Sequence, residues 1–304
     1  MESSIGKYQI TVLMSTYNGE EYLQEQIESI LKQEGVEVRL IVRDDGSCDK
    51  TLSILEHYSR KGLLSFHAEN NVGPQQSFLQ LLQEAPTDDY YAFADQDDIW
   101  FPDKLINGIR GICDNPQIPS LYFSQTLLTD ERLNPIPTEP IHPKLTFGES
   151  LVYAYASGCT MVLNHELRKK ILSYTPSYID MHDRWLINIV TAIGGILIFD
   201  KEPHILYRQH ARNAIGLHDS LYKEWKQRLR RIFHNQQIRY RIATEIYHGY
   251  LHLMPQEHVE TLELFIHAKH RIRPRLQLLF DSRFHCGNRK TWLMFKLSVL
   301  INTY

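Results

Sequence analysis

Three polar motifs each follow an apolar, β-rich run in the first hundred residues, and helical segments separate the runs. The runs cover residues 8–14, 36–43, 63–68 and 90–94. Between them, apolar residues recur at helical spacing over residues 20–33, 49–61 and 75–84. Strands that alternate with helices in this way predict an open, mainly parallel sheet with right-handed crossovers.

The polar motifs occupy the positions where such a sheet binds ligands. They are residues 15–20 (STYNGE), 44–47 (DDGS) and 95–98 (DQDD). In open α/β sheets, ligands bind beyond the carboxyl ends of the strands. Three motifs at three strand ends therefore predict one binding site at that edge of the sheet.

Charge and cysteine content exclude several classes of protein. The 304 residues carry a net charge of −3. From residue 223 onward, however, the sequence contains 15 Lys and Arg and only 6 Asp and Glu. The four cysteines lie far apart without a CxxC pair, which argues against a zinc site and a disulfide framework and favours a reducing cytoplasm. No apolar run reaches the length of a membrane span, and the N-terminal residues lack the apolar core of a signal peptide. We expect a cytoplasmic chain whose membrane contact is peripheral.

The motif at residues 95–98 places three carboxylates within four residues. Asp95, Asp97 and Asp98 repel one another unless a cation or solvent relieves the charge. Mg²⁺ and Mn²⁺ prefer carboxylate and phosphate oxygens, and a metal held there can neutralise a departing diphosphate. The alternative is a solvated acidic turn before the helix that is expected from Pro102.

The order of the motifs resembles family 2 glycosyltransferases with the GT-A fold. The residues that carry this resemblance are 15–18 (STYN), 43–47 (RDDGS), 70–73 (NNVG) and 95–100 (DQDDIW) with Lys104. Together with residues 182–185 (HDRW) and 207–210 (YRQH), the DQDDIW form resembles bacterial rhamnosyltransferases of surface polysaccharide biosynthesis. The resemblance covers residues 10–215. It implies an α/β fold of the Rossmann-like nucleotide-diphospho-sugar transferase type, with a mixed, mainly parallel sheet flanked by helices and a C-terminal helical extension.

The resemblance also assigns roles to individual residues. It implies that Asp44 contacts the nucleotide base and that Mn²⁺ or Mg²⁺ is held by Asp95, Asp97 and His210, with Asp97 as the favoured direct ligand. The residues implied to bind the donor or its nucleotide are Thr16, Tyr17, Asn18, Glu20, Asp44, Asn71, Gln75, Asp95, Gln96, Asp98, Trp100, Lys104 and Arg208. The alternative for His210 is an ordinary surface or helix-start histidine.

Asp183 is the expected general base. In an inverting transfer, the acceptor hydroxyl loses its proton as it attacks the anomeric carbon, and one carboxylate is enough to take that proton. Members of the family carry Glu-Asp or His-Asp at this place, and His182-Asp183 matches the second form. The alternative is a carboxylate that only stabilises the helix N-terminus. Trp185 either stacks on a sugar or belongs to the core.

The expected function is transfer of L-rhamnose from dTDP-L-rhamnose to a hydroxyl of a growing, lipid-linked cell-surface polysaccharide. A UDP-hexose or UDP-N-acetylhexosamine donor is the alternative. A nucleotidyltransferase is more remote, because residues 15–20 contain one glycine and no Lys or Arg. A non-catalytic sugar-binding scaffold would have lost a carboxylate that is present here. No GxGxxG follows the first strand and no GK[ST] occurs, so dinucleotide and P-loop proteins are disfavoured.

Two regions are expected: a glycosyltransferase domain over residues 1–218 and a basic helical region over residues 219–304. The basic region interleaves Lys and Arg with aromatic and aliphatic residues. This pattern fits a helix on the inner face of the cytoplasmic membrane, and equally a packing or dimerisation element. Nucleic-acid binding is not expected, because no recognised module is present.

Overall fold

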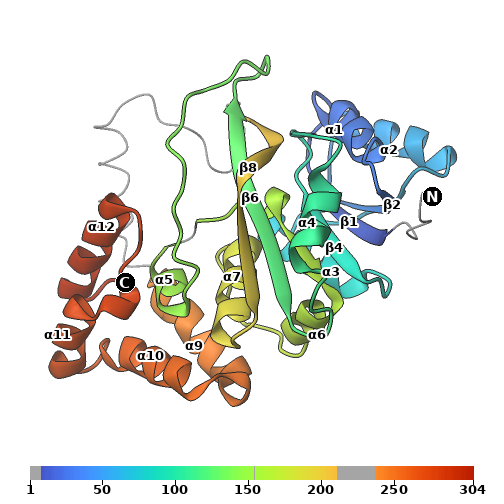
Figure 1. Ribbon diagram of the computed structural model, residues 1–304. Coiled ribbons are helices and arrows are strands. Elements are labelled where there is room, and N and C mark those ends of the chain that lie inside the picture. The colour runs from blue at the N-terminus through green and yellow to red at the C-terminus, as the bar shows by residue number, and fades with distance from the viewer. Residues whose placement is uncertain (1–7, 154, 211–236) are drawn as a thin grey trace, which may run out of the picture.

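The computed structural model of the protein describes residues 8–153, 155–210 and 237–304. Within them, eight strands form one sheet in the order β3-β2-β1-β4-β7-β6-β8-β5. The strands are β1 (Tyr8–Thr16), β2 (Val36–Asp44), β3 (Ser65–Ala68), β4 (Tyr90–Ala94), β5 (Ile99–Trp100), β6 (Ser120–Thr129), β7 (Val162–Asn164) and β8 (Ile196–Arg208). The sheet runs through the middle of the molecule with helices on both sides (Figure 1).

The sheet is mixed and mainly parallel, as predicted. β1 pairs in parallel with β2 and β4, β2 with β3, and β6 with β8. β7 is antiparallel to both β4 and β6, so β4 and β6 point the same way, while β5 is antiparallel to β8. All strands except β5 and β7 therefore end at the same edge of the sheet.

Helices cover both faces because the strands are apolar on both. In β1, Val12 and Met14 pack with one hydrophobic core and Leu13 with the other, as the alternation of strand side chains requires. One core contains α1 (Leu23–Leu31), α2 (Thr51–Arg60) and α4 (Lys104–Ile112). The other contains α3 (Pro74–Glu84), α6 (His165–Leu172) and α7 (His182–Ala192).

The C-terminal helices extend this second core. They are α9 (Ile238–Tyr250), α10 (Gln256–His267), α11 (Ile272–Phe280) and α12 (Arg289–Leu300), and they pack around α5 (Phe147–Val152) and α7. The described residues also contain the short 3₁₀ turns η1 (Gly158–Thr160), η2 (Leu251–Leu253) and η3 (Ser282–Phe284). Figure 1 shows α10, α11 and α12 on the side of the molecule opposite α1 and α2. The predicted helical character is confirmed for the described part of this region, whereas the basic residues between positions 223 and 231 lie outside the described residues.

The structure corrects two segments that the sequence predicts. The proline-rich sequence of residues 116–143 predicts an irregular segment, but β6 occupies Ser120–Thr129 because its apolar start is fully buried at Leu121 and Phe123. The sequence of residues 157–163 predicts a strand, but η1 precedes the three-residue β7 instead.

None of the helices in the described part of the chain combines the length and apolar character required to cross a membrane.

Candidate active site

The carboxyl ends of the strands bring the predicted motifs to one edge of the sheet. The strand register sets Thr16 opposite Asp44 and Met14 opposite Ala94, so β1, β2 and β4 end together. Asp95 follows β4 directly, and Arg208 ends β8 at the level of Thr129, the last residue of β6. The prediction that these motifs share one edge is confirmed.

The loop after β4 holds its carboxylates in a desolvated position. Burial and, to a smaller extent, the charge of the neighbouring Asp97 together raise the pKa of Asp95 to about 7. Burial and the charges of Asp97 and Asp95 also raise the pKa of Asp98 well above its usual range. The Oδ2 atom of Asp98 is buried without a hydrogen-bond partner in the structure. A cation would relieve this repulsion, so the donor set fits a hard divalent metal.

His210 meets Asp97 at the edge of this loop. Its Nε2 atom lies 2.7 Å from Oδ2 of Asp97, and its ring lies 5.1 Å from the ring of Tyr22. Both side chains of the pair are largely buried. Two of the three residues that were predicted as metal ligands are thus in contact. A metal bound by these two atoms would replace their mutual hydrogen bond.

Cys159 lies close to residues 95–98, the loop after β4 that we call the acidic loop. Its Sγ atom and a carboxylate oxygen each of Asp95 and Asp98 lie within 4.8 Å of one another. Cys159 is 1% exposed, and burial together with the two carboxylates raises the pKa of its thiol. Sequence reasoning missed this residue because η1 brings it to the loop from more than sixty positions away.

Arg208 is engaged by the protein rather than directed at an open binding site. Its Nε donates to the carbonyl oxygen of Asp97 (3.0 Å), its Nη1 to that of Glu131 (2.8 Å) and its Nη2 to Glu25 (2.5 Å). The guanidinium also lies 4.4 Å from the ring centroid of Tyr22. With a side chain only 4% exposed, Arg208 holds the acidic loop in place, and its contact with the donor stays a prediction.

Lys104 and Trp100 are also withdrawn from the predicted donor pocket. Lys104 is fully buried, and its Nζ lies 3.8 Å from the ring centroid of Trp100. Burial lowers the pKa of Lys104 to about 7, while the charges of Cys159 and Asp98 act to raise it. Trp100 is 3% exposed. The two side chains pack against each other beneath the loop after β4, and their contact with the donor stays a prediction.

Asp44 is likewise engaged by its own turn. Its Oδ1 accepts from the hydroxyls of Thr16 and Ser47, and its Oδ2 accepts from the backbone N–H groups of Gly46 and Ser47. A carboxylate has about four lone-pair positions, and all are used here. Asp44 is fully buried. It therefore shapes the turn after β2, and its contact with the nucleotide base stays a prediction.

Asp45 is an anchor that sequence reasoning did not single out. Its carboxylate accepts a hydrogen bond from Arg43. It also accepts from the backbone N–H groups of Val72 and Gly73, and these two bonds are each 2.9 Å long. Arg43 is itself 1% exposed. This buried pair ties the end of β2 to the loop before α3, where predicted donor residue Asn71 is exposed and Gln75 half-buried. The sequence feature that could have indicated this role is the motif RDDG at residues 43–46.

The loop after β1 is held by side chains and presents Tyr17 outward. Gln96 binds the backbone of Tyr17 on both sides, accepting from its N–H (2.8 Å) and donating to its carbonyl (3.1 Å). Asn18 has a positive φ of 48° and accepts from the N–H of Cys48, while Glu20 accepts from the N–H of Lys50. The ring of Tyr17 is 50% exposed. Of the predicted nucleoside-pocket residues, Tyr17 is the one that the fold leaves free for stacking.

Asp183 begins α7 beside the acidic loop. Burial raises its pKa to about 6, and the charge of Asp183 in turn raises the pKa of Asp95. The preceding His182 is buried, with its ring 4.1 Å from that of Phe78 and 5.2 Å from that of Phe93 on β4. The structure thus brings the predicted base and the predicted metal loop together. Trp185 is core, since it is 1% exposed.

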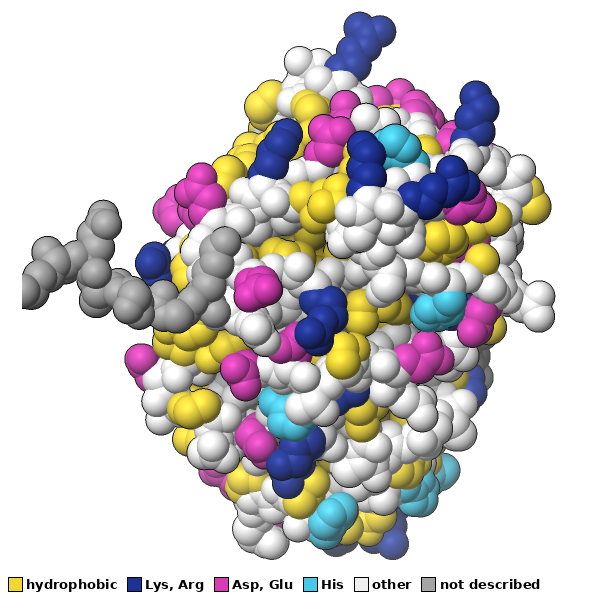
Figure 2. All heavy atoms as spheres, turned by 90° about the vertical axis from the view of Figure 1, so that its right-hand side faces the viewer, with side chains coloured by type: hydrophobic (Ala, Val, Ile, Leu, Met, Phe, Trp, Pro, Cys, Tyr) yellow, Lys and Arg dark blue, Asp and Glu magenta, His cyan; other side chains and the backbone are white. Residues whose placement is uncertain are grey.

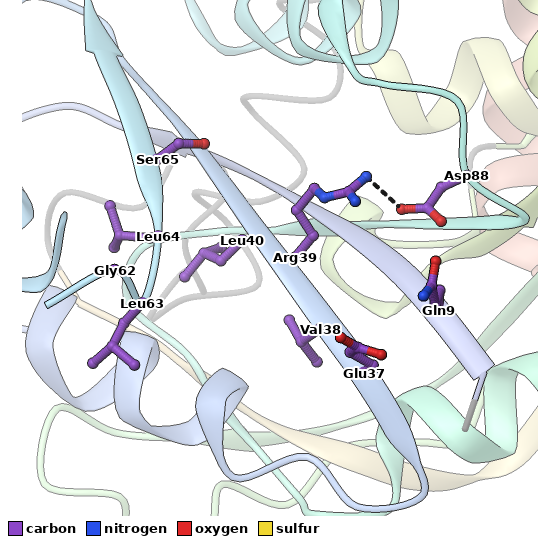
Figure 3. Close-up of a pocket in the computed structure, with 10 residues that line it drawn as sticks. All are labelled: Gln9, Glu37, Val38, Arg39, Leu40, Gly62, Leu63, Leu64, Ser65 and Asp88. Carbon is purple, nitrogen blue, oxygen red and sulfur yellow. Dashed lines mark hydrogen bonds and ion pairs between the residues drawn. The ribbon is translucent and has the colours of Figure 1, made fainter. Parts of the chain in front are cut away.

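A cavity of about 400 Å³ lies elsewhere, at the opposite ends of the strands (Figure 3). It is lined by Gln9 on β1, residues 37–40 on β2, Ser65 on β3, and Asp88, which pairs with Arg39 at 3.1 Å. A nine-residue strand is roughly 26 Å long, so this cavity is remote from the acidic loop. It contains none of the predicted site residues.

Comparison with known proteins agrees with this arrangement. The model of the family described as glycosyl transferase family 2 matches residues 11–172. The dTDP-rhamnosyl transferase RfbG of Shigella flexneri is 29% identical over 231 residues, which cover 70% of this chain and 77% of that protein.

A second relative and a solved structure point the same way. The Escherichia coli protein WfgD, named a UDP-Glc:alpha-D-GlcNAc-diphosphoundecaprenol beta-1,3-glucosyltransferase, is 29% identical over 164 residues, covering 53% of this chain and 62% of that protein. The structure of S. aureus TarS 1–349 in complex with UDP-GlcNAc superposes with a TM-score of 0.59 at 18% identity, covering 97% of this chain and 82% of that one. This likeness shows that the two chains share a fold.

Proposed function

The chain belongs to glycosyl transferase family 2, and from that premise we propose that it is an inverting, metal-dependent transferase that moves L-rhamnose from dTDP-L-rhamnose. The observation that carries the proposal is the cluster of Asp95, Asp97, His210 and Asp183 at the carboxyl edge of the sheet. The choice of rhamnose is supported by the similarity to the dTDP-rhamnosyl transferase. A UDP-hexose or UDP-N-acetylhexosamine remains the second candidate donor, because a UDP-glucose enzyme is also among the relatives.

The metal would be Mn²⁺ or Mg²⁺, held by Asp97 and His210 with Asp95 behind them. Oδ2 of Asp97 and Nε2 of His210 lie 2.7 Å apart. Asp95 is close enough to interact electrostatically with Asp97, and a bound cation would reduce the repulsion between the two carboxylates. When bound, such a metal neutralises charge that develops on the leaving diphosphate. Arg208 and Gln96 keep this loop in position through the backbone of Asp97 and of Tyr17.

Asp183 would take the proton of the acceptor hydroxyl. A carboxylate with a raised pKa is a stronger base than an exposed one, and burial raises the pKa of Asp183 to about 6. Near neutral pH it is still ionised. Its position in the first turn of α7 and its electrostatic interaction with Asp95 support this role.

The acceptor would be a hydroxyl of a growing surface polysaccharide that is linked to a lipid diphosphate. The name of the Escherichia coli glucosyltransferase relative includes such an acceptor, a sugar on diphosphoundecaprenol. An enzyme with this acceptor works at the inner face of the cytoplasmic membrane, so we propose peripheral attachment there. We also propose that residues 1–218 carry the transferase chemistry and residues 219–304 the attachment.

A thermal-shift panel tests the donor. Purified protein is mixed with Mn²⁺ or Mg²⁺ and with dTDP, UDP, GDP and their common sugar conjugates, because a ligand that binds only the folded state raises Tm. We expect metal-dependent stabilisation by dTDP and dTDP-rhamnose. A preference for UDP-sugars would replace rhamnose and keep the transferase, whereas no response to any nucleotide would contradict the proposal.

The stereochemistry of the product tests inversion. From a β-linked dTDP-L-rhamnose, inversion gives an α-rhamnoside. The product is formed on a synthetic lipid-linked acceptor or its soluble analogue, and its anomeric configuration is read by NMR. A β-rhamnoside would contradict the assignment of a single displacement with Asp183 as base.

A further inference from the structure

The outer sides of α11 and α12 expose large apolar residues. Ile272, Leu276 and Phe280 recur every four residues along α11 and are 74%, 52% and 82% exposed. Leu293 and Leu300 on α12 are 57% and 59% exposed. Side chains at these spacings lie on one side of a helix. We call these five residues the α11–α12 face.

The two rows of apolar residues are contiguous. Lys296 lies three residues after Leu293 and four before Leu300, so it belongs to the same side of α12. Its Nζ lies 5.8 Å from the ring centroid of Phe280, the last residue of α11. The opposite sides of the helices are buried in the core through residues such as Leu278 and Phe295. The five exposed apolar residues of the α11–α12 face therefore do not contribute to the buried core between the helices.

The charged residues of α11 and α12 themselves are all basic. Residues 271–304 contain seven Lys and Arg and a single acid, Asp281. Both carboxylate oxygens of Asp281 accept from Arg283, so this acid does not offset the remaining basic residues. By contrast, Figure 2 shows the face on the far side of the molecule, where Lys and Arg are interspersed with Asp and Glu.

We propose that the α11–α12 face docks on an anionic lipid surface. Exposed Ile, Leu and Phe side chains can enter the interface between headgroups and acyl chains, and the surrounding Lys and Arg match anionic headgroups. The inference deepens the proposed function by naming the partner surface of the C-terminal helices, and it rests on that function only for its purpose, access to a lipid-linked acceptor.

A second copy of this chain fits the face less well. In a two-fold symmetric dimer the same patch meets itself, so Arg273, Arg289 and Lys290 of both copies would surround one interface. Like charges placed opposite one another disfavour such pairing, and Asp281 is already occupied by Arg283. A lipid surface supplies the missing negative charge.

Vesicle co-sedimentation of the full-length protein tests the proposal. The vesicles are phosphatidylcholine alone and phosphatidylcholine mixed with phosphatidylglycerol, at low and high salt. We expect binding to the anionic vesicles that weakens as salt rises, because screening reduces the headgroup attraction. The test variant combines Ile272→Ser, Leu276→Ser and Phe280→Ser, and it should lose at least about tenfold in vesicle affinity.

A matched variant controls for loss of exposed apolar residues as such. Leu63, Ile118 and Leu172 are 42%, 41% and 36% exposed and lie outside the face. Changing these three to Ser should leave vesicle binding unchanged. Tm is measured for all variants, and a single Leu293→Ser change provides a milder test if the triple variant does not fold.

Several outcomes would overturn the proposal: no binding of the wild type to anionic vesicles, equal binding to both vesicle types, or equal loss in the control variant. A change from dimer to monomer in the test variant, seen by light scattering without vesicle binding, would assign the face to self-association. Donor-dependent thermal shift and transfer to a soluble acceptor are measured on the same samples. If these persist while vesicle binding is absent, the docking inference and the proposed membrane attachment fail, whereas the proposed transferase activity stands.

Discussion

His182 is a histidine that the fold keeps neutral. Burial lowers its pKa to about 3, and neither ring nitrogen has a hydrogen-bond partner in the structure. Aromatic rings of Phe78 and Phe93 face it, and a Cβ at Gly158 would lie 2.2 Å from its Nε2. Proton binding at this site is thus possible only in the unfolded chain, across the range between about pH 3 and the ordinary histidine pKa near 6.5.

The free energy of unfolding should therefore carry a contribution from His182 that falls as pH is lowered. Because the unfolded state binds the proton, lowering pH from about 7.5 to about 5 should cost about 2 kcal/mol at this site. His182→Gln removes the titration, so the variant should lose less stability over this pH range than the wild type. Urea unfolding of each protein at both pH values gives the change in the free energy of unfolding between them, once for the wild type and once for the variant. Equal differences would show that His182 is not held neutral.

Asp183 is the residue whose loss should affect turnover most. Asp183→Asn removes the proposed base and keeps the shape of the side chain, so kcat should fall by about 10² to 10⁴ while donor affinity is retained. Asp180→Asn is the matched control, since Asp180 lies in the same segment and pairs with Arg184 at 2.9 Å. Initial rates and donor titrations separate the two effects. Weakened donor affinity with normal kcat would make Asp183 a binding residue.

Asp97 and His210 should be required for metal-dependent donor binding. Asp97→Asn should abolish the thermal shift that donor and Mn²⁺ produce together, and His210→Gln should weaken the metal affinity by at least about tenfold. Asp103→Asn, at an exposed acid that follows the same loop, should leave both unchanged. Retention of the shift in the Asp97 variant would refute the metal assignment.

At the residue scale, the sequence predicts which motifs meet but not what each side chain does there. Asp95, Asp97 and Asp98 follow a strand, so their position could be predicted from the sheet alone. The hydrogen bonds of Asp44 arise from a turn that brings Gly46 and Ser47 back to it, and the burial of Lys104 follows from packing on Trp100. Neither depends on a periodic pattern, so neither could be predicted from one.

Among the elements, α5 is held by a single buried carboxylate. Glu149 is fully buried, and its oxygens accept from the backbone N–H groups of Lys144 (2.5 Å), Leu145 (3.1 Å) and Gly287 (3.0 Å). It joins the start of α5 to the loop before α12. A Cβ at Gly148 would lie 2.2 Å from the carbonyl oxygen of Arg283, so the two backbones are already in close contact there.

Glu149→Gln should destabilise the protein, because an amide group would face one of these N–H donors. We expect a loss of about 1 to 3 kcal/mol in the free energy of unfolding, measured by urea denaturation. Glu166→Gln, which removes a surface pair with Lys169, should cost less than about 0.5 kcal/mol. Equal costs in the two variants would mean that Glu149 does not hold the junction.

At this scale the regular βα units could be predicted and β6 could not. The ends of β4 match the prediction, and α3 differs by one residue, because their apolar periods are unbroken. β6 lies between prolines at Pro116 and Pro135, which mark the flanking loops and hide the buried run of Leu121 to Phe123. The prolines of this region therefore did not indicate the strand, because Ser120–Thr129 itself contains no proline.

For the whole molecule, the catalytic half and the C-terminal helices share one hydrophobic core. Tyr250 on α9 lies 5.9 Å from Trp185 on α7, and its hydroxyl donates to the carbonyl oxygen of Ile171 at 3.0 Å. Ile242 and Ile246 belong to the same cluster as Phe93 on β4. The division at residue 218 that we expected from charge therefore does not coincide with a break in packing.

A chain shortened to end before Ile238 should lose its native packing. Removing α9 to α12 would expose Trp185 and its neighbours on α7, the helix that carries Asp183. We expect aggregation, or a state that binds the dye ANS and lacks a near-UV circular dichroism signal. The full-length Leu293→Ser variant, changed only at an exposed site, should remain native. A soluble, active fragment would show that the two regions are independent.

The shared core also constrains how acceptor specificity can pass between related enzymes by recombination. A crossover between Arg208 and Ile238 would be natural if the helices were a separate module. Here it would set one parent's Tyr250 against the other's Trp185, and one parent's Gly287 against the other's Glu149. We therefore expect a functional chimera to inherit α5 and α7, the helix with the proposed base, together with the C-terminal helices of the same parent.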